Sequence, residues 1–140
     1  MENEVFIVSV EALINAPILK VWEMWNSPLH IINWYHASND WHAPHATNDF
    51  KIGSQFLIRM EAKDGSFGFD FSGTYTDIVT NEKIDFILDD GRKVQILFKV
   101  DALGVNMIES FEAENEYPIE LQQNGWQAIL NNFKLYVESI

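Results

Sequence analysis

The stretch KIDFILDDGRKVQILFKV, residues 83–100, decides the fold class. Apolar side chains occupy every second position on both sides of Asp90-Gly91, a pair that is typical of a tight hairpin turn. A period of two places alternate side chains on one face of a strand. The stretch therefore predicts two antiparallel strands that share one apolar face. Its apolar positions are Ile84, Phe86, Leu88, Val94, Ile96, Phe98 and Val100.

The same pattern continues in both directions along the chain. Upstream, two alternating segments flank a second hairpin signal, Asp64-Gly65, and a turn at 81–83 leads into the first stretch. Downstream, Leu103-Gly104 precedes another alternating segment over 105–113. The sequence therefore predicts an antiparallel meander. The upstream positions that share a face are Phe56, Ile58 and Met60, then Phe67, Phe69, Phe71, Gly73 and Tyr75.

Helical signals lie at both ends of this meander. Residues 118–138 form a helix with a broad apolar stripe, roughly 30 Å long at the usual rise per residue, which is enough to cross a sheet. The stripe consists of Leu121, Trp126, Ile129, Leu130, Phe133, Tyr136 and Val137.

The first part of the chain predicts one strand followed by two short helices. The strand covers 4–14, and Asn15 then serves as a helix cap with Pro17 in the first turn. Ser27-Pro28 ends that helix, and a second short helix covers 29–34. Together with the meander and the last helix, this order predicts an α+β fold that forms a single domain over 1–140.

The composition excludes several classes of protein. The chain of 140 residues contains no cysteine, which excludes disulfides, thiolate metal ligands and a cysteine nucleophile. No apolar run approaches the roughly 20 residues that a membrane helix needs. The start, MENEVFIVSV, lacks the basic flank of a secretory signal. A cytoplasmic protein is the expectation.

The charge is strongly acidic. Nine basic residues face 21 acidic ones, for a net charge of -12, and such a field disfavours nucleic acid and anionic membranes as partners. The densest group of acids is either a solvated face or a docking surface for a basic protein partner. This group is Glu109, Glu112, Glu114, Glu116 and Glu120.

The stretch NWYHASNDWHAPH, residues 33–45, gathers two tryptophans and three histidines. His36, His42 and His45 lie six and three residues apart in what reads as an irregular loop, a spacing that does not fit a zinc site. Acid–base pairs of His36 with Asp40, or of His42 with Asp49, are conceivable but belong to no catalytic motif. The sequence therefore predicts no metal, no cofactor and no favoured catalytic residue.

Several short elements, taken in order, resemble a known family. These elements are Ala16-Pro17, Val21-Trp22, Trp34-Tyr35, Trp41 with Pro44, Ile52-Gly53, Asp64-Gly65, Phe71-x-Gly73-x-Tyr75, Gly125-Trp126 and Ile129-Leu130-x-Asn132-Phe133. They look like the small bacterial proteins related to the activator of heat-shock protein 90 ATPase. That family belongs to the START-like (SRPBCC, Bet v 1-like) superfamily, and the resemblance covers nearly the whole chain.

The resemblance implies a helix-grip fold, in which a curved antiparallel sheet wraps around the C-terminal helix and leaves an apolar cavity. Members of the superfamily bind lipids, sterols, polyketides or flavonoid-like molecules. We therefore expect a small hydrophobic ligand in the cavity. Trp34, Tyr35 and Trp41 are expected at its mouth. The further expected ligand contacts are Phe56, Ile58, Met60, Phe69, Phe71, Tyr75, Phe86, Phe98, Trp126, Ile129 and Phe133.

Gly125 lies inside the predicted C-terminal helix. A glycine inside a helix costs roughly 1 kcal/mol relative to alanine, so Gly125 predicts the close approach of a neighbouring group to the backbone.

Two other functions compete with the binding of a hydrophobic ligand. They are a chaperone-associated protein-binding module and a cyclase- or hydrolase-type enzyme. A polar pair with perturbed pKa values deep in the cavity would favour the enzyme, and an all-apolar cavity would favour binding.

Overall fold

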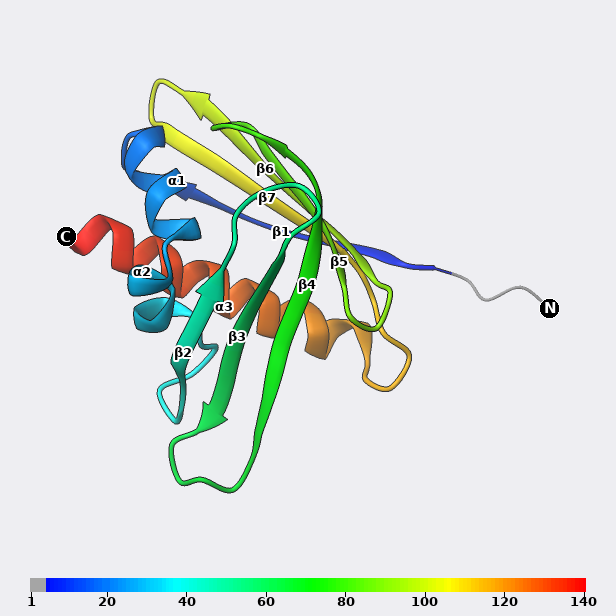
Figure 1. The fold of residues 1–140 in the computed structure, drawn as a ribbon. Helices are drawn as coiled ribbons and strands as arrows, with labels where there is room; N and C mark the ends of the chain where they lie inside the picture. The colour runs from blue at the N-terminus through cyan, green and yellow to red at the C-terminus, as the bar shows by residue number, and fades with distance from the viewer. Residues whose placement is uncertain (1–4) are drawn as a thin grey trace.

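The computed structural model describes residues 5–140, and within them one antiparallel sheet of seven strands curls around a long helix (Figure 1). Glu4, the expected start of the first strand, lies outside the described residues. The strand order is β1-β7-β6-β5-β4-β3-β2. The strands are β1 (Ile7–Ile14), β2 (Trp41–Asn48), β3 (Gln55–Ala62), β4 (Gly68–Val79), β5 (Lys83–Leu88), β6 (Lys93–Asp101) and β7 (Gly104–Glu112).

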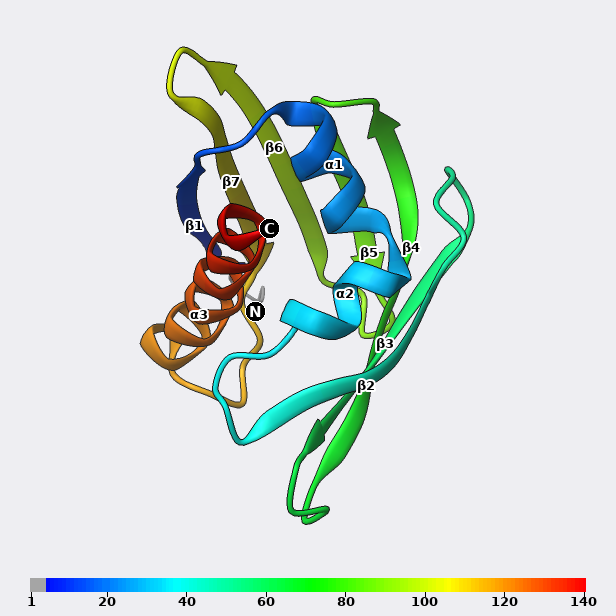
Figure 2. The same cartoon turned by 90° about the vertical axis from the view of Figure 1, so that its left-hand side faces the viewer.

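The helices all lie on the concave side of this sheet, as the view in Figure 2 shows. Helix α3 (Ile119–Ser139) lies next to β1 and β7. Helices α1 (Ile18–Asn26) and α2 (Pro28–Trp34) lie between α3 and the strands at the other end of the sheet, β4, β3 and β2. This is the predicted α+β helix-grip architecture. No helix among residues 5–140 is both long and apolar enough to cross a membrane.

Strict alternation of buried and exposed side chains builds the core. In β7, Val105, Met107, Glu109 and Phe111 point inward and are buried, while the residues between them are only half-buried. Glu109 therefore lies in the core, and its expected place on an acidic surface is wrong. The reason is geometric, because the strand period assigns this carboxyl to the same face as its apolar neighbours.

The predicted hairpin turns are present. Gly65 and Gly91 have φ angles of 77° and 93°, a left-handed conformation that glycine adopts without steric strain. These turns set the registers of the β3–β4 and β5–β6 pairs, in which Ile58 lies opposite Phe71 and Phe86 lies opposite Val94. The hairpin registers thus align the aromatic side chains on the concave face.

The stretch expected as an irregular loop, 33–45, is partly a strand. Residues from Trp41 onward form β2, which pairs with β3 and has a register shift between His42 and His45. Pro44 lies at this bulge on the edge strand, where a missing N–H does not break the sheet.

Two expectations at the helices are also wrong. The cap of α1 is Pro17, whose carbonyl accepts from the N–H groups of Lys20 and Val21, and no side chain caps this helix. The backbone N–H of Asn15 donates to Oε2 of Glu138 at 2.8 Å. In α3, Leu121 is 57% exposed and the adjacent Gln122 is buried. Gln122 takes the inward position because its side chain bonds to the backbone of the preceding loop.

Candidate ligand site between the sheet and helix α3

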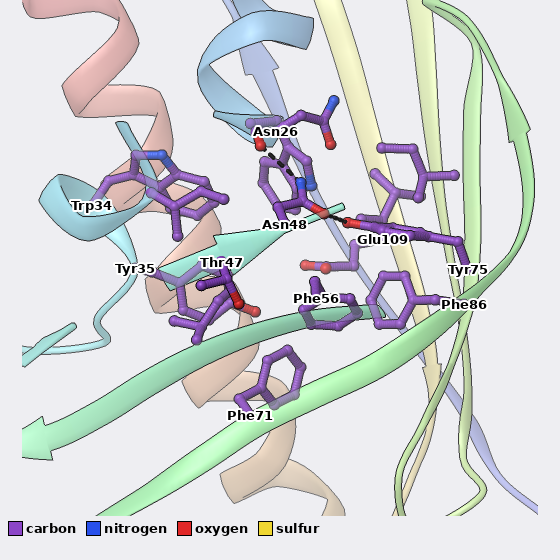
Figure 3. A pocket seen from close by; sticks show the side chains of 15 residues that line it. Asn26, Trp34, Tyr35, Thr47, Asn48, Phe56, Phe71, Tyr75, Phe86 and Glu109 are labelled. Carbon is purple, nitrogen blue, oxygen red and sulfur yellow. Dashed lines mark hydrogen bonds between the residues drawn. The ribbon is translucent and has the colours of Figure 1, made fainter. Parts of the chain in front are cut away.

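A small hollow, here called the inner chamber, lies between the concave sheet and α1–α2. Its volume is about 30 Å³, which is room for one or two water molecules and not for a whole lipid. Most of its wall is aromatic or aliphatic, as Figure 3 shows. It is lined by Trp25, Asn26, Ile31, Trp34, Tyr35, Thr47, Asn48, Phe56, Ile58, Phe71, Tyr75, Ile84, Phe86, Ile96 and Glu109.

A short chain of hydrogen bonds crosses one side of the inner chamber. The Tyr75 hydroxyl donates to Oδ1 of Asn48 at 2.7 Å, and Nδ2 of Asn48 donates to the carbonyl of Asn26 at 2.7 Å (Figure 3). Burial raises the pKa of Tyr75, so its hydroxyl stays protonated. This chain ties β4 through β2 to the end of α1 and fixes the orientation of the Tyr75 ring.

Glu109 is the carboxyl group of the inner chamber. It is 3% exposed, and burial raises its pKa to about 8, so the neutral acid predominates at pH 7. Within residues 5–140 no group donates a hydrogen bond to this carboxyl. Burial also raises the pKa of Tyr35, and the nearby Glu109 and Tyr75 raise it further. The O–H groups of Tyr35, Tyr75 and Glu109 that line the chamber are therefore all neutral at pH 7.

A second hollow, here called the outer groove, opens between α3 and strands β3 and β4. Its volume is about 270 Å³. Tyr35 and Phe71 line both hollows, and their rings lie 5.7 Å apart, so these two side chains separate the groove from the chamber. The groove is lined by Tyr35, Ala37, Met60, Phe69, Phe71, Arg92, Glu114, Leu121, Gln122, Gly125, Trp126 and Ile129.

Gly125 and Trp126 shape the floor of the outer groove. A Cβ atom on Gly125 would meet no atom within 4 Å, so the expected close approach of a neighbour is wrong. The missing side chain instead leaves open space in the groove. The adjacent Trp126 stacks on Phe111, with ring centroids 3.9 Å apart and planes 11° from parallel, so its ring is held rigidly.

A model of the family described as Activator of Hsp90 ATPase homolog 1-like protein matches residues 15–138. The chain belongs to this family. No curated protein sequence matches it. Two solved structures support the assignment. An AHSA1-like protein from Aeromonas hydrophila is 43% identical with a TM-score of 0.90, and the match covers 96% of this chain and 93% of that one.

A protein from Cytophaga hutchinsonii is 49% identical with a TM-score of 0.80, and the match covers 96% of this chain and 92% of that one. A protein from Chromobacterium violaceum has a TM-score of 0.83 at 19% identity, covering 94% and 96% of the two chains, which shows a shared fold alone. The half-barrel sheet of this family fits either a ligand-binding module or a module like the activator of the Hsp90 ATPase.

The expected ligand-contact residues separate into three groups in this family member. Seven line the inner chamber: Trp34, Tyr35, Phe56, Ile58, Phe71, Tyr75 and Phe86. Four others line the outer groove: Met60, Phe69, Trp126 and Ile129. Their contact with a ligand stays a prediction.

Trp41, Phe98 and Phe133 line neither hollow, because each packs against other rings. The ring centroid of Trp41 lies 6.0 Å from that of Phe69. The corresponding distance is 5.0 Å between Phe98 and Trp22, and 4.7 Å between Phe133 and Trp34. Trp41 therefore lines neither hollow, and its contact with a ligand stays a prediction. Phe98 and Phe133 stabilise the core below α1 and α2.

His36 and His42 each lie near a polar side chain of another element. Nε2 of His36 lies 3.0 Å from Nδ2 of Asn132, and Nε2 of His42 lies 3.9 Å from Glu61. Asp40 accepts a hydrogen bond from Ser38, and the pairs His36–Asp40 and His42–Asp49 do not form. Among residues 5–140, no group of three or more possible ligands is placed to hold a metal ion.

From the sequence alone, Glu109 is either a polar residue inside the cavity or part of the acidic surface, and Asn48 is not expected in the chamber. For Glu109 the signal was present, because Val105-x-Met107-x-Glu109-x-Phe111 keeps the carboxyl in phase with the buried residues. Asn48 had no comparable signal, since its contact with Tyr75 joins residues that lie 27 positions apart.

Two of the other acids that the sequence placed in the acidic group contact neighbouring residues of the fold. Glu112 accepts a hydrogen bond from the backbone of Lys93 at 2.7 Å, and Glu114 lies 3.6 Å from Arg92. Among these acids Glu116 and Glu120 are exposed and Glu112 and Glu114 are half-buried, so the acidic surface is smaller than the sequence predicts.

Proposed function

We propose that this protein binds a small hydrophobic ligand whose body lies in the outer groove and whose one end reaches the inner chamber. The observation that carries the proposal is the shared wall. Tyr35 and Phe71 border both hollows, so a movement of either ring would join the groove to the chamber.

The two volumes favour this arrangement over a ligand that is wholly enclosed. Typical pockets for small molecules measure roughly 300–1,000 Å³, and the groove, at about 270 Å³, lies just below that range. The chamber, at about 30 Å³, accommodates a single functional group. Burial of apolar ligand surface, at roughly 25 cal/mol per Å², would drive binding.

The test is a titration of the isotope-labelled protein with a fatty acid, a sterol and a flavonoid, followed by two-dimensional NMR. We expect saturable shifts at the indole of Trp126 and the methyl group of Met60, since both side chains line the groove. The indole of Trp22, which lies away from both hollows, should not move.

A variant and its matched control sharpen this test. A Cβ atom at Gly125 meets no atom within 4 Å, so Gly125→Leu extends a side chain into the open groove, and it also replaces a poor helix former. We expect it to fold at least as stably as the parent and to lose ligand binding. Asn124→Leu changes an exposed residue that does not line the groove, and it should leave binding intact. Equal binding by the Gly125→Leu variant would contradict the proposal.

A second candidate function is the stimulation of a heat-shock ATPase, as the family description reads. The observation that favours it is an aromatic patch of Trp41, Phe67 and Phe69, in which Phe67 is 63% exposed. Phe67→Ser should then abolish stimulation of the ATPase of purified Hsp90, while Val100→Ser, which changes another exposed apolar residue, should not. An unchanged ATPase rate in the presence of the parent protein would exclude this candidate.

A further inference from the structure

The inner chamber places a carboxyl group where the fold provides it no partner. Glu109 projects from β7 toward the middle of the labelled side chains, near Phe56 and Phe86 (Figure 3). Buried polar groups in proteins are almost always hydrogen-bonded, either to protein or to water, so a partner for this carboxyl has to lie in the chamber itself. Among residues 5–140, no side chain or backbone group bonds to this carboxyl.

The surroundings of Glu109 contain no positive charge. The titratable residues that line the chamber are Tyr35 at the end of α2, Tyr75 on β4 and Glu109 on β7, whereas α1, β2, β3, β5 and β6 contribute none. The Tyr75 hydroxyl already donates to Asn48. The Tyr35 hydroxyl makes no hydrogen bond within the described chain. Glu109 and Tyr35 therefore each keep an O–H donor without an acceptor within residues 5–140, as does the hydroxyl of Thr47 on β2.

We propose that Glu109 and Tyr35 act as paired hydrogen-bond donors to the carbonyl oxygen of a neutral hydrophobic ligand. This inference rests on the proposed function and specifies its ligand class. A neutral carboxylic acid and a tyrosine that line the same mostly apolar chamber are an arrangement suited to an oxygen acceptor. The small volume of the chamber matches one carbonyl group, while the rest of the ligand occupies the outer groove.

Other ligand chemistries fit the chamber less well. A ligand carboxylate would enter an apolar space that holds another acid and no cation, which is unfavourable. A ligand ammonium group would first have to ionise Glu109 and then be buried beside it. A hydrocarbon would leave both donors unpaired. These ligands become the controls of the test.

The test compares two probes of the same shape, 2-acetylnaphthalene and 2-isopropenylnaphthalene. The first is a ketone, and the second has a methylene group in place of the carbonyl oxygen. Their dissociation constants are measured with the full chain by fluorescence titration at pH 7. Infrared spectroscopy of the bound ketone then reports whether its carbonyl accepts hydrogen bonds, since the stretching frequency falls when it does.

Two variants separate donation from volume. Glu109→Met removes the donor and keeps a side chain of similar length, so the preference for the ketone over the hydrocarbon should fall by about tenfold, the value of one hydrogen bond. Glu109→Gln retains an N–H donor and should retain most of that preference. Raising the pH to 9 ionises Glu109, so the parent protein should lose the preference while the Glu109→Gln variant keeps it.

The outcomes distinguish this inference from the proposed function. Equal binding of both probes to the parent and to Glu109→Met, with an unshifted carbonyl frequency, would overturn the donor role and leave hydrophobic binding standing. Tighter binding of 2-naphthylmethylamine than of the ketone, with release of a proton, would also overturn it. No binding of any probe would overturn both proposals.

Discussion

At the scale of single residues, Glu109 makes stability depend on pH. Its folded-state pKa of about 8 lies above the usual value of 4.5, so the folded state holds a proton that the unfolded state has already released between these values. The free energy of unfolding should therefore fall as the pH rises from about 4.5 to about 8. The raised pKa corresponds to on the order of 3–5 kcal/mol across this window.

The measurement is chemical denaturation of the parent and of Glu109→Gln at a series of pH values. Glutamine does not ionise, so subtraction of the two curves removes the contribution of every other group. We expect the variant to gain stability relative to the parent as the pH rises, and the difference to level off above pH 8. A constant difference from pH 4 to pH 9 would show that Glu109 titrates normally.

At the scale of elements, Gln122 joins α3 to the loop after β7. Its side chain accepts from the N–H of Glu114 at 2.8 Å and donates to the carbonyl groups of Glu114 and Tyr117 at 3.0 and 2.8 Å. Gln122→Leu leaves three backbone groups without these partners, so we expect the free energy of unfolding to drop by about 2–3 kcal/mol. Denaturant titration measures the change.

The neighbouring Gln123 provides the matched control for this element. It is exposed, and the side-chain hydrogen bond that it donates to the carbonyl of Ser9 is long at 3.4 Å. Gln123→Leu should change stability by less than about 0.5 kcal/mol. Equal losses in the two variants would mean that the loop does not depend on the Gln122 side chain.

At the scale of the whole molecule, the concave side of the sheet is divided by Tyr35 and Phe71. Phe71→Ala should merge the chamber with the groove, because this ring borders both. We expect pyrene to gain affinity relative to naphthalene, since the merged space admits a larger ring system. The lost packing of a half-buried phenylalanine should lower the free energy of unfolding by about 2 kcal/mol. Fluorescence titration with both hydrocarbons measures the ratio.

Phe67→Ala is the control, because Phe67 is exposed beside the same strand and lines neither hollow. Its ratio of pyrene to naphthalene affinity should equal that of the parent. An unchanged ratio in Phe71→Ala would show that the chamber and the groove stay separate without the ring.

The sequence by itself determined every strand except β2, the hairpin turns and the long helix, because each depends on a local period or on a turn residue. Alternation over 83–100 predicted the β5–β6 hairpin, and the positions of Gly65 and Gly91 are those of the observed turns. It also placed the chain in its family. Local reasoning failed for 41–48, where the edge strand β2 tolerates a proline that reads as a loop.

The tertiary structure alone decided how much of the interior is hollow. The sequence shows an excess of aromatic side chains but not whether they fill a cavity or line it. In the fold, Trp25 and Trp34 pack within 4.9 Å of Phe133, which leaves an inner chamber of only about 30 Å³ and an open groove beside Gly125. The physical reason is that packing joins residues far apart in the chain, and no local period encodes the distance between α3 and the sheet.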